Sequence, residues 1–194
     1  MTEKLKRRMQ MVGLGAVLCV IGVAQIPGID PALLVKAKSG NPGAEVAVGT
    51  CYADGKGVAR DPQKAAEWYR KAADQGNVSG ELHLAALYRD GAGKSFPRDM
   101  TQAAAWYRKA ADQGDAGAQG TLGMLYTLGQ GVAQSDVEAY FWLDLAASVA
   151  SPNQAQYMMN RQNVGTHITQ DQLDAIQDRE TKWKAEHPAP AASQ

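Results

Sequence analysis

A single phrase of 36 to 38 residues is written three times along this chain of 194 residues. Each copy reads A-x-x-x-L-G-x-x-Y-x-x-G-x-G and continues, after a short gap, as A-x-x-W-Y-x-K-A-A, with small departures. The central tyrosines are 36 and 38 residues apart, and the tryptophans are 38 and 36 residues apart. The second copy therefore carries a two-residue insertion in its gap, where a structural repeat tolerates one. The recurring aromatic residues are Tyr52, Tyr88, Tyr126, Trp68, Trp106 and Trp142.

Both halves of each copy have the spacing of a helix. In the first copy, the second half places Ala65, Trp68, Tyr69, Ala72 and Ala73 at i, i+3, i+4, i+7 and i+8, which is one helical face. The first half steps by four through alanine, valine and tyrosine, which is also a single helical stripe. A pair of glycines breaks the chain between the two halves of every copy. Each copy is therefore predicted to be a pair of helices.

Polar residues mark where the predicted helices begin. Asp61 precedes Pro62, which combines an acidic N-cap with a proline at the first helical position, where its missing N–H is not needed. Asp99 lies three residues before a glutamine, and Ser135 lies three residues before Glu138. The serine and glutamate have the spacing of a capping box, in which each side chain bonds the other residue's backbone N–H.

Small residues recur in the middle of the first helix of each pair, at Gly49, Ala85 and Gly123. Glycine at such a position costs about 1 kcal/mol relative to alanine, so we expect a neighbouring helix to approach closely, with its tryptophan or tyrosine filling the space. Gly76 and Gly114 suit the left-handed stop after a helix. One helical pair cannot bury its apolar face alone, but three stacked pairs can. The predicted fold class is therefore all-α, an α/α solenoid whose core runs along the stack.

These motifs resemble the Sel1-like repeat family, a branch of the tetratricopeptide-like superhelical proteins. The match rests on residues 44–61, 65–76 and 103–114, and it covers residues 44–150. The third copy departs from the pattern at Leu143, where the earlier copies have tyrosine. The resemblance implies a solenoid of helix-turn-helix repeats that binds partner proteins, often as an adaptor. The copies are placed at 44–77, 78–115 and 116–150.

The first 25 residues are predicted to be an export signal or a membrane anchor. Basic residues precede an uncharged stretch from Met9 to Ile29, whose densest apolar part is Met11 to Ala24. This part resembles the apolar region of a secretory signal, with small residues before a mature start near Gln25. The 21 uncharged residues would also span about 31 Å as a helix, enough to cross a bilayer. Both interpretations place the repeats outside the cytoplasm, because the basic end stays inside.

The segments beside the repeats are predicted to be caps. Residues 30–43 look like the remnant of an earlier repeat, with a helix from Pro31 to Lys38. Residues 188–194 are predicted to be a disordered tail.

Residues 151–187 are predicted to form a C-terminal helical cap. It begins with a short helix around Ala155 to Arg161. Thr169 and Gln172 then have capping-box spacing. We expect the following helix, through Leu173, Ile176 and Trp183, to close the exposed end of the stack.

Charge and cysteine content exclude some classes of function. The chain has 20 basic and 20 acidic residues. Residues 1–25 contain four of the basic residues and one acidic residue, so the remainder has 16 against 19 and a net charge of −3. No basic stripe is available to pair with phosphates, so nucleic acid is not an expected partner. Cys51 is the sole thiol after the leader, and its place beside the core stripe predicts a packed residue rather than a reactive one.

The sequence offers no candidate catalytic residue, metal ligand or cofactor site. No two histidines stand at i and i+4 with a carboxylate, so no zinc site is indicated. His83 lies beside the core stripe, where a packed or half-exposed histidine is expected. The glycine pairs lack the strand and the lysine of a phosphate-binding loop.

Helical geometry places a candidate binding strip on the first helix of each pair. At 100° per residue, one set of positions lies opposite the core stripe, and it varies between copies while the stripe does not. In related solenoids the first helix of each pair lines the concave side. An ordinary solvent-facing surface is the alternative interpretation. The candidate residues are Val46, Thr50, Ala53, Leu82, Ala86, Arg89, Gly120, Met124 and Thr127.

The predicted function is a non-catalytic interaction module, exported to the cell envelope, that binds a partner protein or peptide on the solenoid surface. The membrane is involved only through the N-terminal segment, if that segment is not cleaved. The alternative is an envelope enzyme acting on cell-wall or β-lactam-type substrates, since some Sel1-like proteins have been linked to such activity. A structural spacer with little affinity for any partner is a third possibility.

Overall fold

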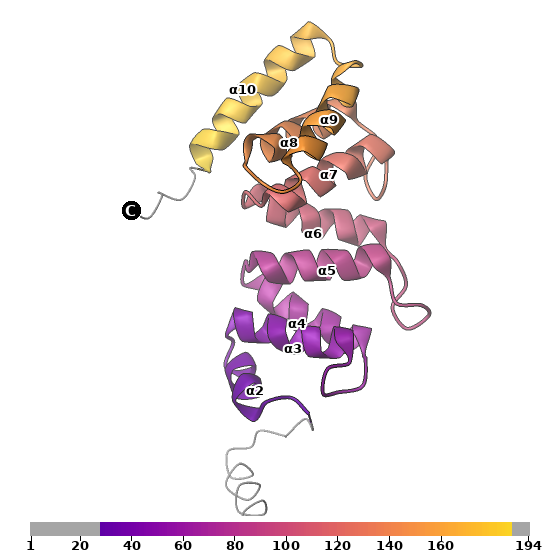
Figure 1. The fold of residues 1–194 in the computed structure, drawn as a ribbon, viewed down its shortest axis with the longest axis vertical. Coiled ribbons are helices and arrows are strands. Elements are labelled where there is room, and N and C mark those ends of the chain that lie inside the picture. The colour runs from indigo at the N-terminus through magenta and orange to yellow at the C-terminus, as the bar shows by residue number, and fades with distance from the viewer. Residues whose placement is uncertain (1–27, 188–194) are drawn as a thin grey trace, which may run out of the picture.

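The computed structural model describes residues 28–187. The predicted leader and the predicted tail lie outside these residues. In the described part the chain forms nine α-helices and no β-strand (Figure 1). The helices are α2 (Pro31–Lys38), α3 (Pro42–Asp54), α4 (Pro62–Asp74), α5 (Val78–Asp90), α6 (Met100–Asp112), α7 (Ala116–Leu128), α8 (Asp136–Ser148), α9 (Gln154–Gly165) and α10 (Gln170–Glu186).

Three successive helix pairs build an elongated stack. They are α3 with α4, α5 with α6, and α7 with α8, and each pair packs against the next. The stack runs from α2 at one end to α9 at the other (Figure 1). The predicted α/α solenoid is therefore confirmed.

The core runs along this stack. One buried cluster extends from Ile29, before α2, to Ile176 in α10, and most of its members come from the repeated stripe positions. Trp106 and Trp142 are buried, whereas Trp68 is half-buried with the Nζ of Lys71 4.0 Å from its ring centre. Cys51, as the stripe predicts, packs partly buried against the cluster.

Polar N-caps start every helix of the repeats. In each case the side-chain oxygen accepts a hydrogen bond from the backbone N–H three residues later, which satisfies one of the free N–H groups of the first turn. Ser135 and Glu138 have capping-box spacing but form only half of the box, because the Glu138 carboxylate bonds to Arg179. The N-cap residues are Asn41, Asp61, Asn77, Asp99, Asp115 and Ser135.

Two carboxylates are buried at equivalent places in the first turns of α3 and α5. Glu45 and Glu81 are 3% and 2% exposed, and each accepts a hydrogen bond from a glutamine that ends the second helix of its own repeat. Burial raises the pKa of both carboxyl groups, and the glutamine amides partly offset that shift. In the third repeat Gln119 takes this place, and it donates to the backbone oxygen of Ala111.

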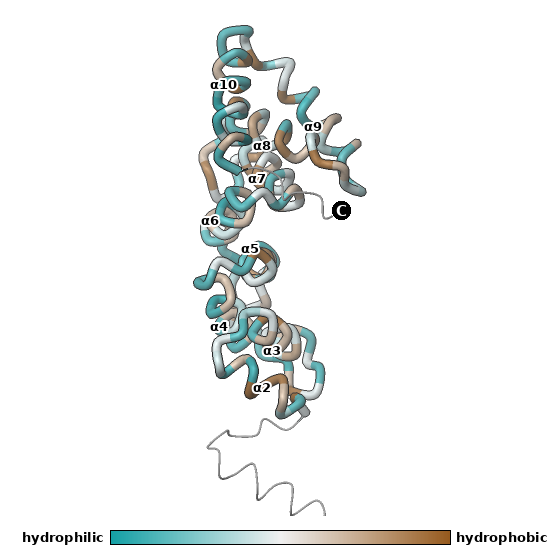
Figure 2. Tube along the Cα trace, turned by 90° about the vertical axis from the view of Figure 1, so that its left-hand side faces the viewer, coloured by the Kyte–Doolittle hydropathy of each residue, from teal (hydrophilic) through white to brown (hydrophobic). Residues whose placement is uncertain are grey.

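The two ends of the stack are closed differently. Helix α2 begins after Asp30 and covers α3, as predicted. Helix α9 packs on α8 at the other end and continues to Gly165, four residues beyond the predicted helix. The expectation that α10 closes the end is wrong. It turns back along the flank of the stack and packs against α8 (Figures 1 and 2).

No helix between residues 28 and 187 is long and apolar enough to cross a membrane.

Candidate protein-binding surface

The candidate residues form what we call the first-helix strip, on α3, α5 and α7. Most are half-buried against the stack, while Arg89 is exposed and Gly120 is buried. The strip is therefore not a uniform surface. It divides into a covered part on α7 and an open part on α3 and α5.

Helix α9 covers the part of the strip on α7. A β-carbon on Gly120 would lie 2.2 Å from a ring carbon of Tyr157, so the glycine is what allows the tyrosine to sit there. The side-chain amide of Asn160 lies 2.9 Å from the sulfur of Met124. Thr127 lines a small pocket with residues 163 and 164 at the end of α9. The covering of these residues by α9 was not predicted from the sequence. Gly120 in particular is inaccessible to a partner.

The open part begins on α3. The Thr50 hydroxyl donates to the backbone oxygen of Val46 and lies 3.2 Å from the hydroxyl of Tyr69 on α4, which donates to it. Thr50 is therefore held by two hydrogen bonds, and Ala53 lies one turn further along the helix. In the described part of the chain, α3 packs mainly against α2, α4 and α5, and these side chains stay partly exposed.

The open part continues on α5 with two apolar residues and one cation. Leu82 and Ala86 lie one turn apart, and Arg89 follows. The Arg89 guanidinium donates to both oxygens of Asp90, at 2.8 and 3.1 Å, and to the hydroxyl of Tyr107 at 3.0 Å. The hydrogen bond from Arg89 lowers the pKa of Asp90, which keeps Asp90 ionised. The Arg89 guanidinium is therefore held in place by these hydrogen bonds, and its charge is partly neutralised by Asp90.

His83 belongs beside this surface, although the sequence pattern did not select it. Its ring stacks on Tyr69, with ring centres 4.9 Å apart and planes inclined by 12°. His83 as a whole is exposed, but partial burial of its ring lowers its pKa, which favours the neutral form at pH 7. The residue immediately follows Leu82, so it extends the strip with a neutral aromatic group.

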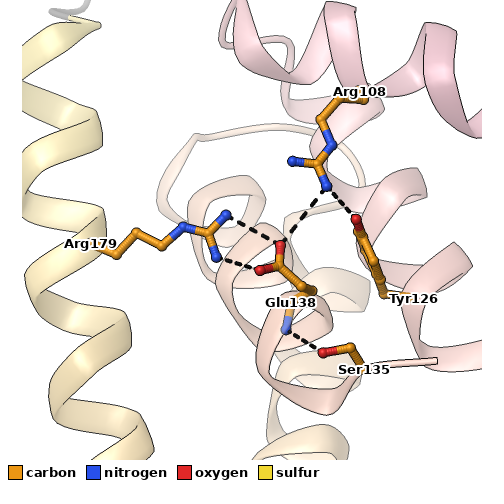
Figure 3. Close-up of polar contacts among 5 residues, drawn as sticks. All are labelled: Arg108, Tyr126, Ser135, Glu138 and Arg179. Atoms are coloured by element: carbon orange, nitrogen blue, oxygen red, sulfur yellow. Dashed lines mark hydrogen bonds and ion pairs between the residues drawn. The ribbon is translucent and has the colours of Figure 1, made fainter. Parts of the chain in front are cut away.

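The C-terminal cap is tied to the stack by a charged network on the other flank. Glu138 of α8 accepts two hydrogen bonds from the guanidinium of Arg179 on α10, at 2.6 and 3.2 Å (Figure 3). Arg108 of α6 lies 4.0 Å from the same carboxylate and donates to the hydroxyl of Tyr126 (Figure 3). The Arg179 guanidinium also lies 3.8 Å from the centre of the Phe141 ring. These contacts make α10 a lateral brace rather than part of the strip.

Between residues 28 and 187, no group of three or more histidine, cysteine, aspartate or glutamate side chains could hold a metal ion. The strip itself combines aliphatic side chains, one fixed cation and a stacked histidine. Such a surface can bind apolar and polar groups of another molecule.

Three solved structures are similar to this chain. A Sel1 repeat protein from Oxalobacter formigenes is 37% identical over 60% of this chain and 47% of its own, with a TM-score of 0.55. A protective antigen of uropathogenic Escherichia coli strains, displaying an SLR fold, is 24% identical over 84% of this chain and 52% of its own, with a TM-score of 0.42. Helicobacter pylori cysteine rich protein B is 21% identical over 64% of this chain and 93% of its own, with a TM-score of 0.50.

The chain spans about half the length of the first two of these structures. No curated protein sequence matches it. The Sel1 repeat model, however, matches residues 42–77, 78–115 and 116–149, which together are more than half of the chain. This protein therefore belongs to the Sel1 repeat family.

Proposed function

We propose that this chain is a docking module that binds a partner protein or peptide on the open part of the first-helix strip. Sel1 repeats generally mediate protein–protein interaction. The observation that carries the proposal is the division of the strip. The chain's own α9 packs on the third repeat, while the candidate residues on α3 and α5 stay at least partly exposed: Val46, Thr50, Ala53, Leu82, Ala86 and Arg89.

The chemistry of the open part suggests what the partner presents. Leu82, Ala86 and Val46 suit apolar side chains, because burying them removes apolar surface from water. Arg89 suits an acidic or carbonyl oxygen, although Asp90 already satisfies part of its hydrogen-bonding capacity. The module is therefore expected to recognise a partner with an apolar stretch and an acceptor at one end.

Site-specific photo-crosslinking tests this proposal. A photoreactive residue at Ala86 should crosslink to one defined protein, and the same residue at Ala105, exposed on the outer face of α6, should not. Leu82→Glu or Arg89→Glu should reduce the Ala86 crosslink at least about tenfold, the loss of about 1.4 kcal/mol of binding energy. The matched control Ala105→Glu should leave it unchanged. Equal crosslinking in all variants, or none at Ala86, contradicts the proposal and favours a structural spacer.

We further propose that the repeats act outside the cytoplasm, as the basic and then apolar N-terminal sequence suggests. Alkaline phosphatase fused after Gln194 should be active, because that enzyme requires an oxidising compartment to form its disulfides. Mass spectrometry of the purified chain then distinguishes a mature start near Gln25 from an uncleaved anchor. An inactive fusion that is stably expressed contradicts export.

The enzymatic alternative has its own test. Purified protein incubated with cell-wall fragments or a chromogenic β-lactam should show no turnover above the buffer rate. Turnover that copurifies with the folded chain would overturn a purely docking role.

A further inference from the structure

Four charged side chains meet where α8, α9 and α10 come together. Asp144 comes from α8, Arg161 from α9, and Glu180 and Lys184 from α10. We call this group the carboxyl junction. Glu180 is 6% exposed, which makes it one of the few buried charged residues in the described chain. The docking strip does not include this group, and it lies on the flank that α10 covers.

The hydrogen bonds of the junction are incomplete. Arg161 donates to Asp144 rather than to Glu180. Lys184 Nζ lies 3.5 Å from one oxygen of Glu180. The other oxygen, Oε1, is buried and has no hydrogen-bond donor within residues 28–187. The Asp144 carboxylate is close enough to Glu180 to raise its pKa.

Two facing carboxylates can form a hydrogen bond only if one of them carries a proton. An ionised carboxylate is only an acceptor, whereas a protonated one supplies one O–H donor. Like charges held this close favour protonation of one member of the pair. Burial, reinforced by Asp144 and opposed by Lys184, raises the pKa of Glu180 to about 7. The burial of Glu180, its unpartnered Oε1 and the nearby Asp144 carboxylate therefore favour a proton on Glu180.

Helix α10 is attached in a way that allows it to separate from the stack. It follows a short segment, residues 166–169, and its main packing partner in the described chain is α8. Its other anchors are the Arg179 pair with Glu138, the buried side chain of Ile176 and the contact of Trp183 near Gly114. Ile176 is the only buried residue that α10 contributes to the core cluster of the described chain.

We infer that the carboxyl junction is a proton-operated latch: with a proton on Glu180, α10 is held against α8, and without it α10 is released from the flank of the third repeat. The direction of the pH dependence follows from thermodynamic linkage, because Glu180 binds its proton more tightly when α10 is docked than when α10 is free. Docking is strongest below the ordinary pKa of glutamate and weakens as the pH rises through about 7. For a pKa that moves from 4.5 to about 7, the docking equilibrium changes about 25-fold between pH 5.5 and pH 8.

Other titratable groups lie at the ends of α10 and must be separated from the latch. His167 Nδ1 lies 3.5 Å from Asp136, and His187 lies close enough to Asp112 to affect it electrostatically. The experiment therefore needs a variant that removes Glu180 alone.

Hydrogen exchange of the full chain at pH 5.5 and pH 8, corrected for the intrinsic exchange rates, tests the latch. Amides of residues 176–184 should be about 25-fold better protected at pH 5.5. Glu180→Gln, a neutral isostere that keeps a donor for Asp144, should reduce this ratio to less than about threefold. Asp144→Asn should also reduce it, because the asparagine amide can donate to an ionised Glu180. Amides of α4, which lies away from α10, should change in protection much less than those of residues 176–184.

Glu138→Gln is the matched control. It weakens the pair with Arg179, so it should lower the protection of α10 at both pH values while leaving their ratio unchanged. Carbon-detected NMR titration of the Glu180 carboxyl adds an independent measurement and should give a midpoint near 7. A wild-type ratio near one, a ratio that survives Glu180→Gln, or a carboxyl midpoint near 4.5 would each overturn the inference.

Discussion

Gly49 allows the ring of Tyr69 to lie directly against α3. A β-carbon at this position would lie 2.7 Å from two carbons of that ring, and the hydrogen bond between the tyrosine hydroxyl and Thr50 limits how far the ring can turn away. The sequence predicts this contact, because glycine inside a helix is unfavourable unless it permits a close approach. It does not predict each partner, since Gly123 meets Leu143 where an aromatic ring was expected.

We predict that Gly49→Ala lowers the free energy of unfolding by about 1–3 kcal/mol, the usual cost of overpacking. Alanine is the better helix former, so a destabilised variant would show that the clash with Tyr69 outweighs propensity. Gly43→Ala is the control, because a β-carbon there meets only one side-chain oxygen, at 3.5 Å. Its effect should stay within about 0.5 kcal/mol. Urea unfolding measures both, and an unchanged midpoint for Gly49→Ala contradicts the packing argument.

The buried polar residues include pairings that were not predicted from the sequence. Glu45 and Glu81 occupy the same repeat position, and Gln75 and Gln113 recur in register with them. The recurrence of both the glutamate and the glutamine at equivalent positions indicates a hydrogen-bonded pair. It was missed because acidic residues in the first turn of a helix are ordinarily explained by the helix dipole. Glu180 gave no such signal, since it lies outside the repeats and its partner Asp144 is 36 residues away in sequence.

At the scale of the helices, the sequence predicts that a helix forms more reliably than it predicts where that helix packs. The capping box at Thr169 marks the start of α10 correctly, and the repeat pattern gives α3 to α8. The position of α10 depends on Arg179 meeting Glu138, which lies 41 residues earlier. Helical periodicity shows which face of a helix will be buried, but not what will cover it. The same reason explains why the covering of Gly120 by α9 was not foreseen.

We predict that Arg179→Lys loosens α10 without unfolding the stack. Lysine keeps the charge but loses the paired hydrogen bonds to Glu138 and the stacking on Phe141. The expected loss of about 0.5–1.5 kcal/mol corresponds to a roughly three- to tenfold fall in hydrogen-exchange protection of α10. Lys182→Ala, on an exposed position of the same helix, should have no effect. Protection that falls equally in α4 and α6 would mean that α10 is not a separate unit.

At the scale of the whole molecule, stability is distributed along a line. Each repeat contacts its neighbours, so the free energy of the stack is approximately the sum of the repeats and the interfaces between them. The terminal repeat is the vulnerable one, because its outer face needs a cap. Helix α9 supplies that cap by burying Tyr157 and Val164 against Leu143 and its neighbours on α8.

This picture predicts that two C-terminal truncations behave differently. A chain ending at Gly165 lacks α10 but keeps α9, and it should still unfold cooperatively, with a loss of about 2–3 kcal/mol from the exposure of Ile176 and its contacts. A chain ending at Ser148 also exposes the surface under α9, and the lost burial of Tyr157 and Val164 should cost a further 3–6 kcal/mol, roughly. Urea unfolding of both, followed by circular dichroism, measures the difference.

The chain ending at Ser148 also exposes Met124 and Thr127, so the first-helix strip would then be uncovered on all three repeats. If α9 serves only as a cap, a photoreactive residue at Met124 should crosslink the docking partner in the chain ending at Ser148, but not in the chain ending at Gly165. Truncations with the same unfolding midpoint would show that the third repeat needs no cap. The long, one-dimensional core would then be an insufficient account of how this chain holds its fold.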